Sequence, residues 1–418
     1  MQVEIITIGD ELTSGRVLDL NACYAALRLT TSGLRVTRVT TVGDDPGRVA
    51  EAVRAAIKES RFVIITGGLG STQDDLTNQT AADALRRPLC LDGQKFAQIE
   101  RHARARGIVM TPSLEKMAWM PKDAQPLSTT EDVCGFSVVE GKAKLFFLPG
   151  VPEQMRDLMD RFVLPEILRE CDSLPATGYR VLKVYGLSEP SIAETLKKLP
   201  AGRDEVMLGF YPRFPENHIT LSKRGEDEPA VTEAMNRVEQ GVRALLGPYV
   251  FATGEETMAE VVGALLREKA LTLSTAESCT GGLIGHLLTQ VPGSSDYYQG
   301  GVVVYSNPSK VRLLGVLPET LREHGAVSDP AVRQMAEGIR KAIPSAMGIS
   351  VTGIAGPGGG SREKPVGTVY IGLATNAGTR SGKYHFRGSR EQVKSNSAMM
   401  ALDWVRRFLR GDPFVPGL

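Results

Sequence analysis

The chain has 418 residues, of which 42% are apolar and 23% charged, so it is long enough for about three domains and can build ordinary cores. Lys and Arg number 49 and Asp and Glu 48, a balance that argues against a protein that coats nucleic acid or membrane with positive charge. The five cysteines are scattered and form no CxxC pair, so we expect no disulfide framework and a cytoplasmic location. We expect neither a membrane span nor a signal peptide, because no apolar run is long enough and the N-terminus has no basic region.

Strand and helix patterns alternate through residues 1–170. Helical spacing covers Pro46–Lys58, and apolar strands are expected over Val3–Ile8, Arg35–Val42, Phe62–Thr66 and Lys144–Leu148. Near-continuous apolar strands that alternate with helices are typical of sheets covered on both faces. This segment therefore predicts an α/β domain with a parallel sheet.

The middle segment, residues 171–253, shows a different order of elements. Helices are expected over Pro190–Leu199 and Pro229–Leu246, and strands over Tyr179–Tyr185, Val206–Tyr211, His218–Ser222 and Tyr249–Ala252. The order β-α-β-β-α-β predicts a small split α/β module. Its charges nearly cancel and it has no GxxG loop, so we do not expect it to bind nucleic acid.

Residues 254–412 predict a third α/β unit. It begins with an amphipathic helix over Thr257–Lys269 and ends with a helix from about Glu391 to Leu409. The strands expected between these helices are Leu271–Thr275, Gly301–Tyr305, Met347–Thr352, Gly367–Ala374 and Gly382–Phe386.

A candidate nucleophile, Ser278, follows the first strand of this third unit in the run ESCTGG. The carboxyl end of a strand is the usual location of sites in α/β proteins. Backbone amides at Thr280, Gly281 and Gly282 could bind an oxyanion beside Ser278. The alternative is that these residues only cap the next helix, and Cys279 is a rival nucleophile because thiolates are intrinsically stronger.

A serine hydroxyl requires a base, and the sequence shows no Ser/His/Asp set. The candidate base is Lys310 in YSNPSK, where Tyr305 ends an apolar strand and Lys310 lies in the first turn of the next helix. A partly desolvated lysine can be neutral near pH 7 and accept a proton. The alternative is a solvated surface lysine, which is the more common case.

Two glycine-rich turns could approach phosphate groups closely. The run TGIAGPGGG, which begins at Thr352 and Gly353, suits a ribose or phosphate contact or, alternatively, a mobile loop; it is not a Walker A loop. The run TGGLGST precedes Asp74 and Asp75, so its amides could form an anion nest beside carboxylates that hold a divalent metal. The alternative is that these two acids cap a helix.

The combination of motifs is more specific than any one of them. IGDELTSGRVLDLN, TGGLGSTQDDLT and LPGVPEQM resemble the N-terminal domain of the CinA family, which is similar to molybdopterin-binding domains. ESCTGG, YSNPSK and TGIAGPGG resemble its C-terminal domain, which is similar to PncC-type nicotinamide-nucleotide amidases. The resemblance covers almost the whole chain and implies a KH-like middle module and a homodimer. Ser71 departs from the family, which usually has a proline there that would stiffen the turn.

For the C-terminal domain, the resemblance implies hydrolysis of nicotinamide mononucleotide to nicotinate mononucleotide and ammonia, without a cofactor. It implies that Ser278 is the nucleophile, Lys310 the general base and Tyr305 a helper in proton relay or orientation. Substrate contacts are implied for Thr280, Gly281, Gly282, Thr352, Gly353 and Arg390, the last of these with the phosphate.

For the N-terminal domain, the resemblance implies an ADP-ribose pyrophosphatase that depends on Mn²⁺, Co²⁺, Ni²⁺ or Mg²⁺. The implied metal ligands are Asp10, Glu11, Asp74 and Asp75. The implied nucleotide contacts are Asn21, Gly68, Gly70, Thr72, Pro149 and Glu153. Two alternatives stay open: a non-catalytic domain that binds a pterin or nucleotide, and a non-enzymatic partner in DNA uptake or repair.

Overall fold

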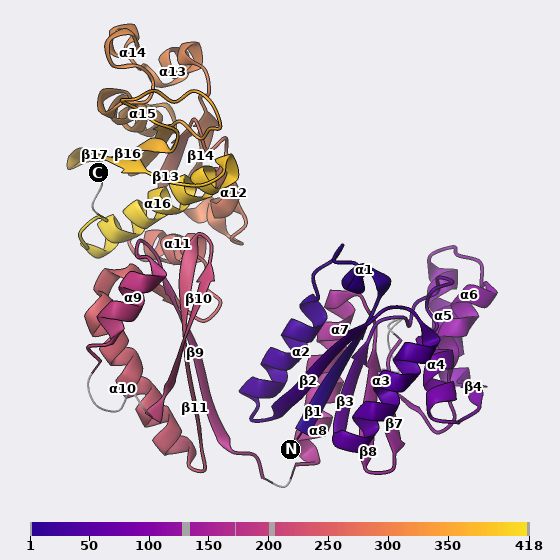
Figure 1. Ribbon diagram of the computed structural model, residues 1–418. Helices are drawn as coiled ribbons and strands as arrows, with labels where there is room; N and C mark the ends of the chain where they lie inside the picture. The colour runs from indigo at the N-terminus through magenta and orange to yellow at the C-terminus, as the bar shows by residue number, and fades with distance from the viewer. Residues whose placement is uncertain (1, 128–133, 172, 200–204, 416–418) are drawn as a thin grey trace. The chain divides into compact units, whose positions relative to one another are not determined.

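The computed structural model describes residues 2–127, 134–171, 173–199 and 205–415. The chain divides into two compact units, one formed by Met1–Thr177 with Arg224–Val231 and the other by Gly178–Lys223 with Thr232–Leu418. Each of the three α/β segments predicted from the sequence is built around a sheet of its own (Figure 1). No helix in the described part of the chain is long and apolar enough to cross a membrane.

The first sheet has the strand order β2-β1-β3-β8-β7-β6. Its strands are β1 (Gln2–Ile8), β2 (Arg35–Val42), β3 (Phe62–Thr66), β6 (Gln125–Pro126), β7 (Phe136–Glu140) and β8 (Ala143–Leu148). Strands β2, β1, β3 and β8 run parallel, as predicted, whereas β7 is antiparallel to both of its neighbours, β8 and β6. The expectation of a parallel sheet is therefore wrong at this edge, because only Gly141 and Lys142 connect β7 to β8 and so short a turn must reverse the chain.

Helices cover both faces of this sheet. In β1, Val3 and Ile5 pack in one core and Ile6 and Ile8 in another, because successive residues of a strand point to opposite faces. The helices are α1 (Asp10–Thr13), α2 (Leu20–Thr31), α3 (Pro46–Glu59), α4 (Thr77–Ala84), α5 (Gly93–Ala105), α6 (Pro112–Glu115), α7 (Pro152–Leu158) and α8 (Leu164–Arg169), with a short 3₁₀ helix η1 (Lys116–Ala118) and a π-helical segment η2 (Met159–Val163) that joins α7 to α8. Strands β4 (Leu89–Leu91) and β5 (Trp119–Pro121) form a separate antiparallel pair.

The middle segment has the predicted order of elements. Its sheet, in the order β10-β11-β9-β12, contains β9 (Ala176–Val184), β10 (Met207–Arg213), β11 (Glu216–Gly225) and β12 (Val250–Thr253). The helices are α9 (Glu189–Leu196) and α10 (Glu228–Leu246), followed by the turn η4 (Gly247–Tyr249).

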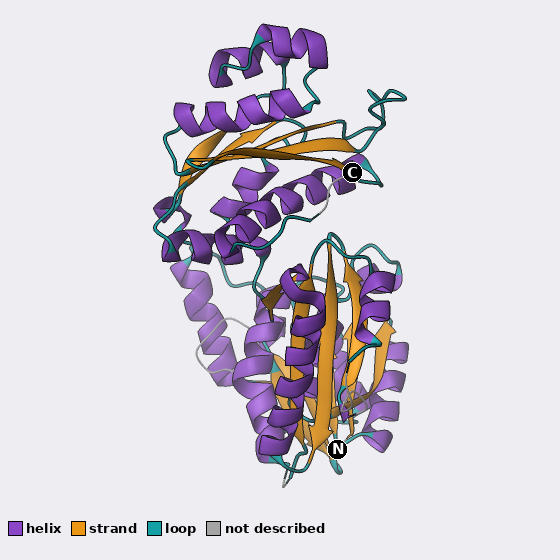
Figure 2. Cartoon of the chain, turned by 90° about the vertical axis from the view of Figure 1, so that its left-hand side faces the viewer, coloured by secondary structure: helices purple, strands orange, loops and turns teal. Residues whose placement is uncertain are grey.

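The C-terminal segment is a sheet with helices on both faces. Its strands, in the order β14-β13-β15-β16-β17, are β13 (Leu273–Glu277), β14 (Tyr298–Val303), β15 (Met347–Gly353), β16 (Thr368–Thr375) and β17 (Gly378–His385). Helix α15 (Asp329–Ala342) covers one face, and α11 (Met258–Glu268) and α16 (Arg390–Arg410) lie on the other (Figure 2). The remaining helices are α12 (Leu283–Thr289), α13 (Asn307–Leu314) and α14 (Pro318–His324), with the turn η5 (Ser294–Asp296).

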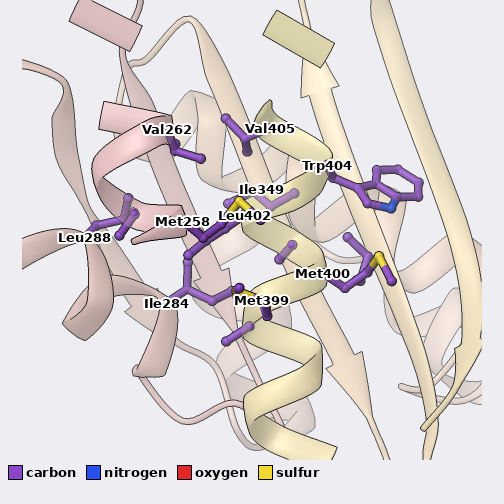
Figure 3. Close-up of a cluster of buried hydrophobic side chains, with 14 of the residues drawn as sticks. Met258, Val262, Ile284, Leu288, Ile349, Met399, Met400, Leu402, Trp404 and Val405 are labelled. Carbon is purple, nitrogen blue, oxygen red and sulfur yellow. The ribbon is translucent and has the colours of Figure 1, made fainter. Parts of the chain in front are cut away.

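The core on the α16 face fixes the helices that border the carboxyl end of strands β13 and β15. Met258 of α11, Ile284 and Leu288 of α12 and Leu402 of α16 pack together with Ile349 of β15 (Figure 3). Because all of these side chains are buried, α12 and α16 are held against β15. Both helices begin next to the candidate site described below.

Candidate functional site

Three motifs of the C-terminal domain meet at the carboxyl end of its parallel strands. β13 ends just before Ser278, β14 just before Tyr305, and β15 ends at Gly353. A cavity of about 160 Å³ lies there, lined by Ser278, Cys279, Tyr305, Lys310, Ala326, Val327, Thr352, Gly353, Ala355 and Arg390. The structure thus brings together motifs that are far apart in the sequence, at the position where α/β folds usually bind ligands.

Lys310 is buried against Ser278. Its side chain is 1% exposed, and its Nζ donates hydrogen bonds to Ser278 Oγ at 3.1 Å, Val304 O at 2.7 Å and Tyr305 O at 3.2 Å. No acidic side chain forms an ion pair with it in the described part of the chain. The alternative of a solvated surface lysine therefore does not hold.

Local sequence explains how Lys310 reaches this position. Ser306 caps α13, with its Oγ accepting from the amide of Ser309, and Pro308 suits the first turn because its missing N–H would be unpaired there. Burial lowers the pKa of Lys310 because the charged ammonium loses its hydration. The two carbonyls accept two of its N–H groups, so in the neutral amine the lone pair can face the Ser278 hydroxyl.

Cys279 is a poor nucleophile in this environment. Burial raises the pKa of its thiol to about 12, since a thiolate would lose its hydration there. The reactive form of a cysteine is the thiolate, which is therefore scarce at neutral pH. Of the two neighbouring candidates, the structure favours Ser278.

The Tyr305 hydroxyl points to Arg390. It accepts a hydrogen bond from Arg390 Nη2 at 3.0 Å, and Arg390 Nη1 donates to Gly356 O at 2.6 Å. The tyrosine side chain is 63% exposed, and its described hydroxyl contact is with Arg390, not with Ser278 or Lys310. These contacts indicate that Tyr305 orients Arg390 rather than relaying a proton.

Thr352 and Gly353 line the cavity together with Ser278. Thr352 Oγ1 donates to Ala326 O at 2.9 Å. A side chain at Gly353 would come within 2.7 Å of Val369 and 3.1 Å of Cys279 Sγ, so only glycine fits between β16 and Cys279 at this position.

The predicted oxyanion amides are only partly available. The amide of Gly281 donates to Ser278 O at 3.2 Å, and that of Gly282 donates to a carboxylate oxygen of Glu277 at 3.0 Å. By contrast, no carbonyl or carboxylate accepts from the amides of Cys279 and Thr280 among the described residues. The hydroxyl of Thr280 is also buried without a partner there.

A second cavity, of about 460 Å³, gathers the motifs of the N-terminal domain. Its lining includes Glu11 after β1, the turn from Gly67 to Asp75 after β3, and Pro149 after β8. Asn21 lines an adjacent smaller cavity, where its Nδ2 donates to Gly150 O at 2.8 Å and Thr66 Oγ1 at 3.1 Å. Glu153 lines neither cavity, and the sequence reasoning missed Asp44, which follows β2 and lines the larger one.

The carboxylates around this cavity do not converge on one point. Asp10 and Asp44 each accept a hydrogen bond from the other's backbone amide, and Asp75 Oδ2 accepts from the amide and hydroxyl of Thr72. Burial, together with the nearby Asp10, Glu11 and Asp74, raises the pKa of Asp44. In the described part of the chain, no three Asp, Glu, His or Cys side chains are arranged to hold an ion. As they stand, the predicted ligands do not form a preformed metal site.

Family models match three consecutive parts of the chain. They are a probable molybdopterin binding domain over residues 4–169, a damage-inducible protein CinA KH domain over 179–252 and a CinA C-terminal domain over 255–409. Among solved structures, the competence/damage inducible protein CihA of Agrobacterium tumefaciens is 38% identical, with a TM-score of 0.36 over 37% of this chain and 93% of that one. The protein CinA with unknown function from Thermoplasma acidophilum is 31% identical, with a TM-score of 0.37 over 40% and 97%.

Similar proteins extend over the full length. A CinA-like protein of Citrifermentans bemidjiense is 42% identical over 423 residues, which cover 100% of both chains. A CinA-like protein of Desulfotalea psychrophila is 38% identical over 413 residues, or 99% of this chain and 100% of that protein. These matches confirm the resemblance found from the motifs and the three-domain α/β architecture. The chain belongs to the CinA family.

Proposed function

We propose that the C-terminal domain is a serine amidase that hydrolyses nicotinamide mononucleotide to nicotinate mononucleotide and ammonia. The observation that carries the proposal is the buried Lys310 amine at 3.1 Å from the Ser278 hydroxyl. This pairing supplies a nucleophile and its base in one water-poor site. The choice of substrate rests on the motifs of the family.

The reaction follows from this geometry in two stages. Lys310 takes the hydroxyl proton of Ser278 while Ser278 Oγ attacks the carboxamide carbon, and the carbonyl oxygen becomes an oxyanion. The amide of Cys279, which lines the cavity and has no carbonyl or carboxylate acceptor among the described residues, is a donor available to that oxyanion. The Lys310 ammonium then returns its proton to the nitrogen, ammonia leaves, and water hydrolyses the acyl-serine with Lys310 again as base.

The site also supports recognition of a nucleotide monophosphate. At about 160 Å³ the cavity is smaller than the ~300–1,000 Å³ pockets that enclose whole drug-sized ligands. It therefore suits the nicotinamide end of the substrate. Arg390 lines its wall and keeps a positive charge that could meet the phosphate, while Tyr305 and Gly356 hold its guanidinium in place.

Mass spectrometry of nicotinamide mononucleotide tests the proposal. After incubation with the full-length protein in ¹⁸O-labelled water, we expect nicotinate mononucleotide with one labelled oxygen in its carboxylate, together with ammonia. Unchanged substrate would contradict the proposal. So would release of free nicotinamide, because that product requires cleavage of the glycosidic bond.

A second candidate function is hydrolysis of the pyrophosphate of ADP-ribose by the N-terminal domain. The specific observation in its favour is the cavity of about 460 Å³ that combines glycine-rich turns with Glu11, Asp44, Asp74 and Asp75. Glycine turns suit a pyrophosphate, and carboxylates suit a divalent metal that such hydrolysis commonly uses. The carboxylates would have to rearrange for an ion to bind, so the metal requirement must be measured.

For this second function, we expect AMP and ribose 5-phosphate from ADP-ribose when Mn²⁺ or Co²⁺ is added. Asp75→Asn should reduce this rate by about 10–100-fold, because it weakens the Thr72 turn and removes a charge from the cavity. Asp83→Asn, an exposed acid on α4, is the matched control and should keep the wild-type rate. Failure to form AMP at any metal concentration would favour the non-catalytic alternative.

A further inference from the structure

The residue before the candidate nucleophile carries a buried carboxylate. Glu277, the last residue of β13, is 1% exposed. One of its oxygens accepts from the amides of Gly282 at 3.0 Å and Ile284 at 3.1 Å, and the other accepts from the amide of Gly285 at 2.9 Å. Among the described residues no basic side chain forms an ion pair with it, so these three amides are what stabilise its charge.

These bonds define the turn that holds Ser278. On one side of the turn, the amide of Ser278 donates to Val351 O at 3.0 Å. On the other side, Gly281 and Gly282 have φ values of 65° and 96°, which suit glycine, and Glu277 closes the turn through the amide of Gly282. The amides of Cys279 and Thr280, which follow Ser278, have no carbonyl or carboxylate acceptor in the described chain. Cys279 lines the cavity beside Ser278, whereas Thr280 is fully buried and does not line it.

The surroundings of Glu277 leave little room for another arrangement. A side chain at Gly285 would lie 2.8 Å from the Tyr298 hydroxyl and 3.7 Å from a Glu277 oxygen. The Tyr298 hydroxyl in turn forms a hydrogen bond with Thr275 Oγ1 at 2.8 Å. The carboxylate is therefore enclosed between α12, β13 and β14, and it has two acceptor oxygens for its three donors.

We infer that Glu277 is a positioning residue of the amidase, which sets the Cys279 amide at the oxyanion by binding the start of α12. This inference rests on the proposed function. Glu277 takes up the amide of Gly282, which would otherwise compete for the oxyanion, and holds the turn in one conformation. Glu277 therefore helps to stabilise the transition state, where the oxyanion is present. It contributes little to binding of the substrate, whose carboxamide is uncharged.

Glu277→Gln keeps the shape of the side chain but replaces one acceptor oxygen with an NH₂ group. If the side-chain oxygen of the glutamine accepts from the amides of Gly282 and Ile284, its NH₂ group faces the backbone N–H of Gly285. Two donors would then meet, so the turn must shift. We expect kcat for nicotinamide mononucleotide to fall by about 10²-fold, as after loss of one oxyanion donor, and KM to change less than about threefold. The shape of the pH–rate profile should stay, because the contacts of Lys310 are unchanged.

Glu260→Gln is the matched control for a merely structural loss. Glu260 also bonds to the start of a helix, through the amide and hydroxyl of Thr257, but it lies outside the lining of the Ser278 cavity. Both variants should lower the melting temperature, whereas only Glu277→Gln should lower kcat. If Glu277→Gln does not fold, Glu277→Asp keeps the charge, withdraws it by one methylene, and is expected to show the same selective fall in kcat.

Two results would overturn the inference: a folded Glu277 variant with kcat within about twofold of wild type, or a loss confined to KM. Equal losses of kcat in the Glu277 and Glu260 variants would also overturn it. Failure of the proposed function looks different, since the wild type itself would then leave nicotinamide mononucleotide unchanged.

Discussion

Ser278→Ala is expected to lower kcat for deamidation of nicotinamide mononucleotide by at least about 10³-fold, a loss typical of removing a catalytic nucleophile. Ser278 Oγ is the atom that the Lys310 amine contacts, and alanine leaves no group to carry the acyl intermediate. The measurement is the rate of ammonia release by the full-length protein, with circular dichroism to confirm that the variant is folded. KM should change little, because the hydroxyl contributes mainly to the chemical step.

Cys279→Ala is the matched control for this prediction. It removes a neighbouring nucleophilic atom from the same turn, but burial keeps that thiol protonated, with its pKa at about 12. The variant should therefore retain most of its activity. The reverse pattern, with an active Ser278→Ala and an inactive Cys279→Ala, would reassign the nucleophile to the thiol.

Much of the fold could be predicted because its signals are local and periodic. The helical spacing over Pro46–Lys58 corresponds to α3, and the apolar run Phe62–Thr66 is β3. β14 begins at Tyr298, earlier than the strand expected at Gly301–Tyr305, because Gly300 and Gly301 weaken the strand pattern that normally marks such a segment. The strand β7 was also missed. Its antiparallel direction could not be predicted from its own residues, since pairing direction depends on contacts between strands and not on either strand alone.

The chemistry of the site could be predicted only in outline. A glycine-rich run after a strand indicates where Ser278 lies, but burial of Lys310 and the orientation of Tyr305 depend on tertiary packing. Glu277 gave no signal, because a glutamate at the end of a strand is ordinarily assigned to the surface. The same rule fails for Asp403 and Arg406, which are fully buried and paired with each other in α16.

The expected pH dependence of the proposed amidase activity follows from the environment of Lys310. Burial lowers its pKa from the ordinary 10.5, so the neutral amine becomes available at a lower pH than for a solvated lysine. We expect kcat/KM of the wild type to rise from neutral pH upward and to level off at an apparent pKa below 10.5. A rate that does not change with pH over this range would contradict Lys310 as the base.

Lys310→Arg separates the base from the positive charge. A guanidinium stays protonated up to a pH of ~12 or more and cannot accept the Ser278 proton, so the variant should lose about as much activity as Ser278→Ala. Lys310→Met removes both charge and base and should show the same loss. An Arg variant with substantial activity would mean that the lysine acts only through its charge.

Stability measurements on Lys310→Met test the same pKa shift without any substrate. Because the pKa of Lys310 is lower in the folded protein than in the unfolded chain, the unfolded chain binds more protons between the two values. The contribution of this lysine to stability therefore rises as the pH increases towards its ordinary 10.5, and it falls as the pH decreases. The free energy of unfolding of the wild type should increase relative to that of Lys310→Met over this range, in urea titrations at successive pH values. A difference between the two proteins that is independent of pH would mean that folding does not lower the pKa of Lys310, which would contradict its role as a neutral base near neutral pH.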